Sequence, residues 1–270
     1  MYKYLVLCLS LMIVGCDQQT ESGKTPTQIE QQPTSEQKIE KFPVIQPKTK
    51  LIQPFKTCKT CTKFEIISLK TSTSWINDWI EQQQTDIVLE QIPEKFRGKP
   101  EKKLKKVANL YDQASKKWLR EFELNQPYEL KLETLFQYQH GPYILLRLRM
   151  DTEQEGVEIK DRVYFKVLDR ELKKSVYLKD ILQASQLKTM DQWVQHEYQI
   201  MLKQQDKMFQ KQFPQQLKWE NAEWFFDQQG IGLHYKTNEI MKQSPQFDIY
   251  LTSEQTQKVL KPEVYGHMFN

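Results

Sequence analysis

The sequence contains few of the residue patterns that mark the common kinds of active or binding site. It has 8 glycines among 270 residues, and no glycine-rich loop that could cradle a phosphate group. Its 4 histidines show no metal-binding spacing. The 39 basic residues nearly balance the 35 acidic ones, so charge does not indicate nucleic-acid binding. We therefore predict no metal, no cofactor and no nucleic-acid partner.

A long apolar segment is also missing. The first apolar run, from Tyr4 to Val14, is shorter than the roughly 20 residues that a membrane-spanning helix needs, but it suits a signal peptide. The run ends in Ile13-Val14-Gly15-Cys16, which resembles the bacterial lipobox. This resemblance implies a signal peptide at 1–15 and a diacylglycerol on Cys16 that anchors an exported protein to membrane lipid. An ordinary secretory signal with a stray cysteine is the alternative, and the choice between inner and outer membrane stays open.

Residues 16–56 form a polar stretch rich in Gln, Thr, Ser, Lys and Pro. Such a composition buries too little apolar surface to offset the entropy of ordering, so we predict a disordered tether. Behind it we predict two similar-sized subdomains, at 57–155 and 156–270.

Hydrophobic periodicity indicates an α+β fold, with antiparallel sheets and packed helices. Helical patterns follow Ser74, cover 101–122 and extend from Thr189 to Phe213. In the second of these helices, the lysines face away from the apolar stripe. Alternating patterns predict strands at 62–70, 128–138, 143–150, 163–168, 223–226, 231–235 and 247–251.

Three segments resemble a family of extracytoplasmic modules found in PdaC-type peptidoglycan deacetylases and RsiV-type anti-sigma factors. They are Tyr164–Leu182, the aromatic strand and glycine turn of Trp224–Tyr235, and Asn238–Leu260. The resemblance implies a non-catalytic module of the cell envelope. Its ligand would be a lysozyme-like protein or peptidoglycan. The chain departs from the family at 151–156, where a glycine-rich turn is expected, and at Ser244-Pro245, so ligand contacts cannot be transferred for these turns.

Cys58 and Cys61 form the sharpest local motif, Cys-Lys-Thr-Cys. Export favours their oxidation to a structural disulfide. A thiol–disulfide exchange site is the alternative, but such sites need a helix that starts at the first cysteine, and here a strand pattern follows.

Two charged segments are candidate contact surfaces. Asp151, Glu153 and Glu155 lie in a predicted acidic hairpin turn that could contact a ligand. Its resemblance to a calcium loop fails at the twelfth position, which is Arg162. A basic helix face could meet anionic lipid or wall polymer, through Lys102, Lys103, Lys105 and Lys106.

Catalysis finds little support. Ser185 and Lys188 match a Ser-x-x-Lys pattern, but so do Ser35 and Lys38 in the predicted tether, and the companion motifs are absent. We predict a binding module rather than an enzyme, with an unrecognised envelope hydrolase as an alternative.

Overall fold

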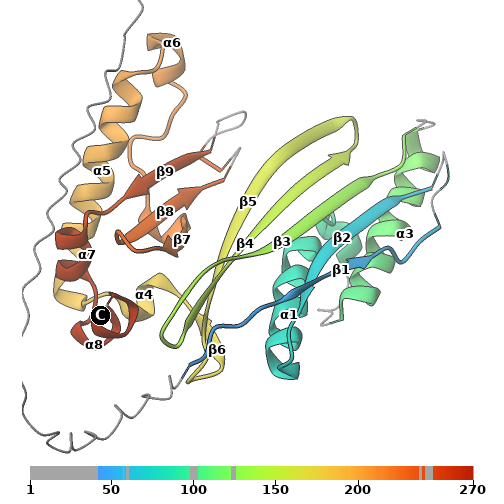
Figure 1. Cartoon of the computed structure of the whole chain (residues 1–270). Helices are drawn as coiled ribbons and strands as arrows, with labels where there is room; N and C mark the ends of the chain where they lie inside the picture. The colour runs from blue at the N-terminus through green and yellow to red at the C-terminus, as the bar shows by residue number, and fades with distance from the viewer. Residues whose placement is uncertain are drawn as a thin grey trace, which may run out of the picture. The chain divides into compact units, whose positions relative to one another are not determined.

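The computed structural model describes residues 42–56, 58, 61–97, 103–122, 126–236, 239–240 and 246–269. Its helices and strands occur largely in separate runs, which confirms the predicted α+β class. The described strands form one six-stranded sheet and one three-stranded sheet (Figure 1). The predicted signal peptide, Cys16 and the tether up to residue 41 lie outside the described residues.

The six-stranded sheet follows the order of the chain. Its strands are β1 (Lys48–Ile52), β2 (Lys63–Lys70), β3 (Glu129–His140), β4 (Tyr143–Gln154), β5 (Val157–Asp169) and β6 (Lys174–Val176). The sequence predicted antiparallel sheets, and the β2–β3 pair is the exception, because it is parallel. A parallel pair needs a long crossover, which α1 (Ser74–Glu90), α2 (Glu94–Arg97) and α3 (Leu104–Phe122) supply.

The first hydrophobic core lies between this sheet and the two long helices α1 and α3 (Figure 1). The helices contribute side chains at helical spacing, including Ile76, Ile80, Val107, Tyr111 and Trp118. The predicted apolar stripe of α3 runs to Phe122, and it is confirmed for the six members whose burial the structure describes, from Leu104 to Trp118. The lysines of α3 point to solvent, as predicted.

The first four residues of β4 are buried on both faces, and this part of the strand links the first core to a second one. Ile144, Leu146 and Leu148 face the first core, whereas Tyr143 and Leu145 belong to the second. The near-continuous apolar run of β4 fits a strand covered on both sides.

The second core is built mainly by the C-terminal part of the chain. Its sheet contains β7 (Glu223–Phe226), β8 (Ile231–Tyr235) and β9 (Phe247–Tyr250), all antiparallel. The helices are α4 (Leu178–Ile181), α5 (Leu187–Lys203), α6 (Lys207–Gln210), α7 (Ser253–Val259) and α8 (Pro262–Phe269), with single 3-10 turns η1 (Ala184–Gln186) and η2 (Trp219–Asn221). This core also buries Trp219 and Trp224.

Three boundaries differ from the sequence-based expectations. The range predicted as tether includes β1, which pairs with β2, so its last residues belong to the folded body. The expected division near residue 156 falls at the turn of the β4–β5 hairpin, and both strands lie in one sheet. The two cores are therefore divided by the sheet rather than by a point in the sequence. The helix predicted to reach Phe213 ends at Lys203.

Candidate ligand-binding cleft

A cleft lies where the three-stranded sheet meets strands β3, β4 and β5. Its volume is about 770 Å³. Its lining comes from strands β3, β4, β5, β7 and β9, from the turn after β7 and from the start of α7. The lining residues are Gln137, Tyr138, Leu145, Phe165, Phe225, Phe226, Asp227, Gln228, Gln229, Tyr250, Leu251, Thr252 and Ser253. We call this feature the aromatic cleft.

Five aromatic rings line the aromatic cleft and pack against one another. The rings of Phe165 and Phe225 lie 4.7 Å apart, and that of Tyr250 meets Phe225 edge-on at 5.1 Å. On the other side, the Tyr138 ring packs edge-on against Phe226 at 5.4 Å. The Tyr250 side chain is 57% exposed, and those of Tyr138 and Phe165 are half-buried. The cleft thus offers ring surface to a ligand.

Gly232 allows the Phe225 ring to lie against β8. A Cβ atom at this position would lie 2.5 Å from Cε2 and 2.7 Å from Cε1 of Phe225, and closer still to Cζ. No side chain larger than hydrogen fits there unless the ring moves. The glycine of the Ile-Gly-Leu segment therefore determines the position of the inner ring of the cleft.

The turn between β7 and β8 holds the polar side of the cleft. Asp227 accepts a hydrogen bond from the backbone nitrogen of Gln229 through its carboxylate, at 2.8 Å. The turn ends at Gly230, where φ is +153° and a Cβ atom would lie 2.6 Å from the Thr256 hydroxyl oxygen. That hydroxyl accepts a hydrogen bond from Ile231 N at 3.1 Å, which ties the turn to α7. The turn is thus fixed before any ligand arrives.

The aromatic cleft carries almost no charge. None of the described residues that line it is basic, and Asp227 is the one acidic residue among them. Partial burial raises the pKa of the Tyr138 hydroxyl, and the Asp227 carboxylate raises it further. Burial also raises the pKa of Tyr250, with contributions from Asp248 and Asp227. Both hydroxyls therefore stay neutral donors at physiological pH.

A second cleft, of about 570 Å³, borders β5 on the side of α1 and has a different character. There the Lys166 ammonium lies 2.8 and 2.9 Å from the two carboxylate oxygens of Glu223. Lys236 lies 3.4 Å from Glu223 and 3.4 Å from Glu239. Burial lowers the pKa of Lys236, but these carboxylates outweigh it and the pKa is raised overall. Because the charges are paired, we assign this cluster a role in joining β5 to β7.

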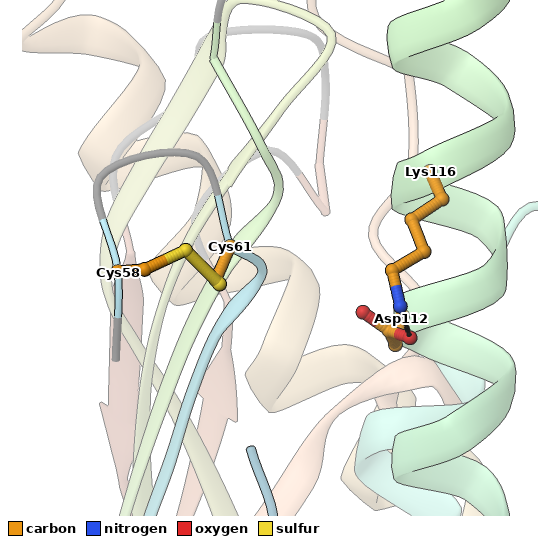
Figure 2. Close-up of a disulfide and its surroundings, with 4 residues drawn as sticks. All are labelled: Cys58, Cys61, Asp112 and Lys116. Atoms are coloured by element: carbon orange, nitrogen blue, oxygen red, sulfur yellow. Dashed lines mark hydrogen bonds and ion pairs between the residues drawn. A yellow bond between two sulfur atoms is a disulfide. The ribbon is translucent and has the colours of Figure 1, made fainter. Parts of the chain in front are cut away.

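The structure contains the disulfide between Cys58 and Cys61. Figure 2 shows it in the connection between β1 and β2, together with the ion pair of Asp112 and Lys116 on α3. The Cys61 backbone nitrogen donates to the Cys58 carbonyl at 3.3 Å, as in a tight turn. Strand β2 begins two residues after Cys61, and no helix begins at either cysteine. This context is typical of a structural disulfide rather than an exchange site.

The three predicted acidic contact residues do not converge on a common point. Asp151 and Glu153 lie in β4 and line a shallow pocket of mixed charge on the sheet, of about 410 Å³. Glu155 lies in the hairpin turn and accepts a hydrogen bond from the Tyr128 hydroxyl at 3.1 Å. The Asp151 carboxylate accepts one from Asp161 N at 2.7 Å. These residues stabilise the hairpin, and none of them lines the aromatic cleft.

The predicted basic surface is present in part. Lys103, Lys105 and Lys106 are exposed at the start of α3, and Lys102 lies outside the described residues. Helix α3 packs its apolar side on the first core, so this basic surface is separate from the aromatic cleft.

In the described residues, no three His, Cys, Asp or Glu side chains gather closely enough to bind a metal ion. None of the helices in this part of the chain combines the length and hydrophobicity needed to cross a bilayer.

The sequence alone did not predict the aromatic cleft as a site. It placed Tyr138, Phe225 and Tyr250 in or at the ends of strands, but strand alternation cannot show which face another element covers. A signal was nevertheless present, because the Phe-Phe-Asp-Gln-Gln-Gly sequence puts rings directly before a polar turn.

No family model and no curated protein matches the sequence. Among solved structures, the chain is similar to a DUF3298 family protein from Pseudomonas aeruginosa PAO1, with a TM-score of 0.58 and 16% identity over 84% of this chain and 98% of that one. It is also similar to a DUF3298 family member from Bacteroides fragilis NCTC 9343, with a TM-score of 0.56 and 13% identity over 83% and 97%. At these identities the likeness shows the fold alone. The finer resemblance to RsiV-type and PdaC-type modules stays a prediction. The body of this chain therefore has the fold of these DUF3298 family structures.

Proposed function

We propose that this protein is a non-catalytic binding module of the bacterial cell envelope, and that its ligand site is the aromatic cleft. The observation that carries the proposal is the cleft itself, an open and preformed site where the exposed ring of Tyr250 and the half-buried rings of Tyr138 and Phe165 meet polar side chains. The fixed β7–β8 turn supports binding, because a preformed site loses little entropy when a ligand docks.

Export and lipid anchoring are part of the same proposal. The support is the lipobox-like Cys16 behind an apolar run, and the oxidised Cys58–Cys61 pair, which suits a compartment outside the cytoplasm. A diacylated cysteine would hold the folded body at the membrane surface, facing the periplasm. Labelling of the full chain with a fatty-acid analogue in bacterial cells tests this point. We expect label in the wild type and none in Cys16→Ala.

Binding is tested with the full chain purified in detergent. We propose two envelope ligands, peptidoglycan and a lysozyme-like protein. Insoluble peptidoglycan is sedimented with the protein, and lysozyme is measured separately by titration. Saturable binding of either one, weakened by substitution of Tyr250 in the aromatic cleft, supports the proposal. If a Tyr250 variant binds both ligands as tightly as the wild type does, the cleft is not the ligand site.

A second candidate binding surface, for a basic protein such as lysozyme, is the pocket where strands β2 and β3 adjoin the β4–β5 hairpin, because carboxylates gather there. The shallow pocket there is lined by five carboxylates, those of Glu65, Glu129, Asp151, Glu153 and Glu158, and three lysines, Lys63, Lys131 and Lys160, offset part of their charge. If this surface is used, Glu153→Lys weakens lysozyme binding and leaves peptidoglycan binding unchanged. Complementary charge would act mainly on the association rate and would be screened by salt.

A further inference from the structure

The aromatic cleft has a chemistry that specifies its ligand more closely than the proposal above. We infer that it binds carbohydrate, as a neutral sugar chain stacked on Tyr250 and Phe165 and hydrogen-bonded by the amides of Gln137, Gln228 and Gln229. This inference rests on the proposed function, because it names the ligand class of the same site.

The low charge of the cleft argues against anionic and strongly cationic ligands. A site for phosphates, nucleotides or acidic peptides needs cationic donors, and none of the described lining residues is basic. A site for strongly cationic ligands needs several carboxylates, and Asp227 is the single one in that lining. What the cleft favours is a ligand that is polar without being charged.

The aromatic rings suit the apolar faces of sugars. A pyranose ring presents a patch of C–H groups that packs on an aromatic face, which removes apolar surface of both partners from water. Tyr250 is 57% exposed, and its ring is held by the Phe225 ring, so it can receive a sugar without a prior rearrangement. Phe165 lies beside Phe225 and extends this surface toward β5.

The polar residues suit the hydroxyl groups of sugars. Each hydroxyl both donates and accepts hydrogen bonds, and a glutamine amide does the same through its two ends. Three glutamines are exposed at the cleft, namely Gln137, Gln228 and Gln229. Within the described residues, their side chains form no hydrogen bonds. Their amides are therefore available to a ligand, and two of them lie on the fixed turn that follows Asp227.

The test is a calorimetric titration of the full chain in detergent with a soluble hexamer of β-linked N-acetylglucosamine. The wild type is compared with Tyr250→Ala, which removes the ring, and with Tyr250→Phe, which keeps it. Tyr177→Ala is the matched control, because Tyr177 is 61% exposed and lines the second cleft instead. Thermal unfolding of each variant shows that the fold is retained.

We expect Tyr250→Ala to weaken oligosaccharide binding about tenfold or more, as removal of a central aromatic contact does in other interfaces. Tyr250→Phe and Tyr177→Ala should bind as the wild type does. No saturable binding of the oligosaccharide, or equal binding by Tyr250→Ala, overturns the inference.

The source of a failure can be recognised from the peptidoglycan and lysozyme assays on the same preparations. If the wild type binds either of these but not the oligosaccharide, the carbohydrate inference fails and the binding module stands. If it binds none of the three, the proposed function fails as well.

Discussion

Replacing Gly232 with alanine tests how the three-stranded sheet positions the inner ring of the aromatic cleft. The added methyl would lie 2.5 to 2.7 Å from the two ε carbons of Phe225, whereas carbon atoms in contact are normally about 3.5–4.0 Å apart. The ring must therefore move by about 1 Å. Phe225 is 6% exposed and packed by Phe165 and Tyr250, so its neighbours must shift as well. Overpacking of this kind lowers the free energy of unfolding by about 1–3 kcal/mol.

The same substitution should raise the free energy of unfolding, rather than lower it, once the ring is absent. In a Phe225→Ala background the methyl meets no ring, and a glycine-to-alanine change then stabilises by about 0.4–1 kcal/mol through the unfolded state. The effect of Gly232→Ala should thus differ by about 1.4–4 kcal/mol between the two backgrounds. Equilibrium unfolding in denaturant, followed by tryptophan fluorescence, measures all four members of this double-mutant cycle.

Gly266→Ala in α8 is the matched control. Nothing lies within 4 Å of a Cβ atom at Gly266, so alanine should stabilise the helix by about 0.5–1 kcal/mol. If Gly232→Ala lowers stability equally with and without the Phe225 ring, the ring is not the reason for this glycine, and the account of the cleft is wrong.

Three further predictions concern the folded body. A chain that begins after residue 52 lacks β1 and the two hydrogen bonds between Ile45 and Gln139, so its unfolding free energy should fall by at least about 2 kcal/mol relative to a chain that begins at residue 42. Replacing Cys58 and Cys61 together with serine should lower stability by about 2 kcal/mol in denaturant unfolding, and an undiminished stability would mean that the disulfide contributes nothing. Burial raises the pKa of both Tyr164 and Tyr198 to about 12, so they stabilise the fold below pH 10, and this stability is lost as pH rises through 12. An ultraviolet titration should show their ionisation delayed in the folded protein, and normal ionisation there would contradict the assigned burial.

The sequence by itself determined the local elements and much of their burial. The spacing of Leu104, Val107, Tyr111 and Trp118 fixes which side of α3 is buried, because a helix repeats every 3.6 residues. The alternation from Tyr128 onward gives β3 in the same way, and the polar residues before Gly230 give the β7–β8 turn. These patterns act over a few residues, so they can be read without knowing the rest of the fold.

Only the tertiary structure decided how these elements combine. Strand β1 has four exposed residues, and the side chains that pack this segment on the first core, Ile45, Ile52 and Phe55, are too far apart in the chain to form a strand pattern. The parallel pairing of β2 with β3 depends on the crossover through α1 and α3. The aromatic cleft forms because Phe165 of β5 meets Phe225 of β7, two residues that are distant in the chain. Strand alternation assigns each side chain to a face, but whether that face is covered or open to a ligand is decided by the element that packs against it.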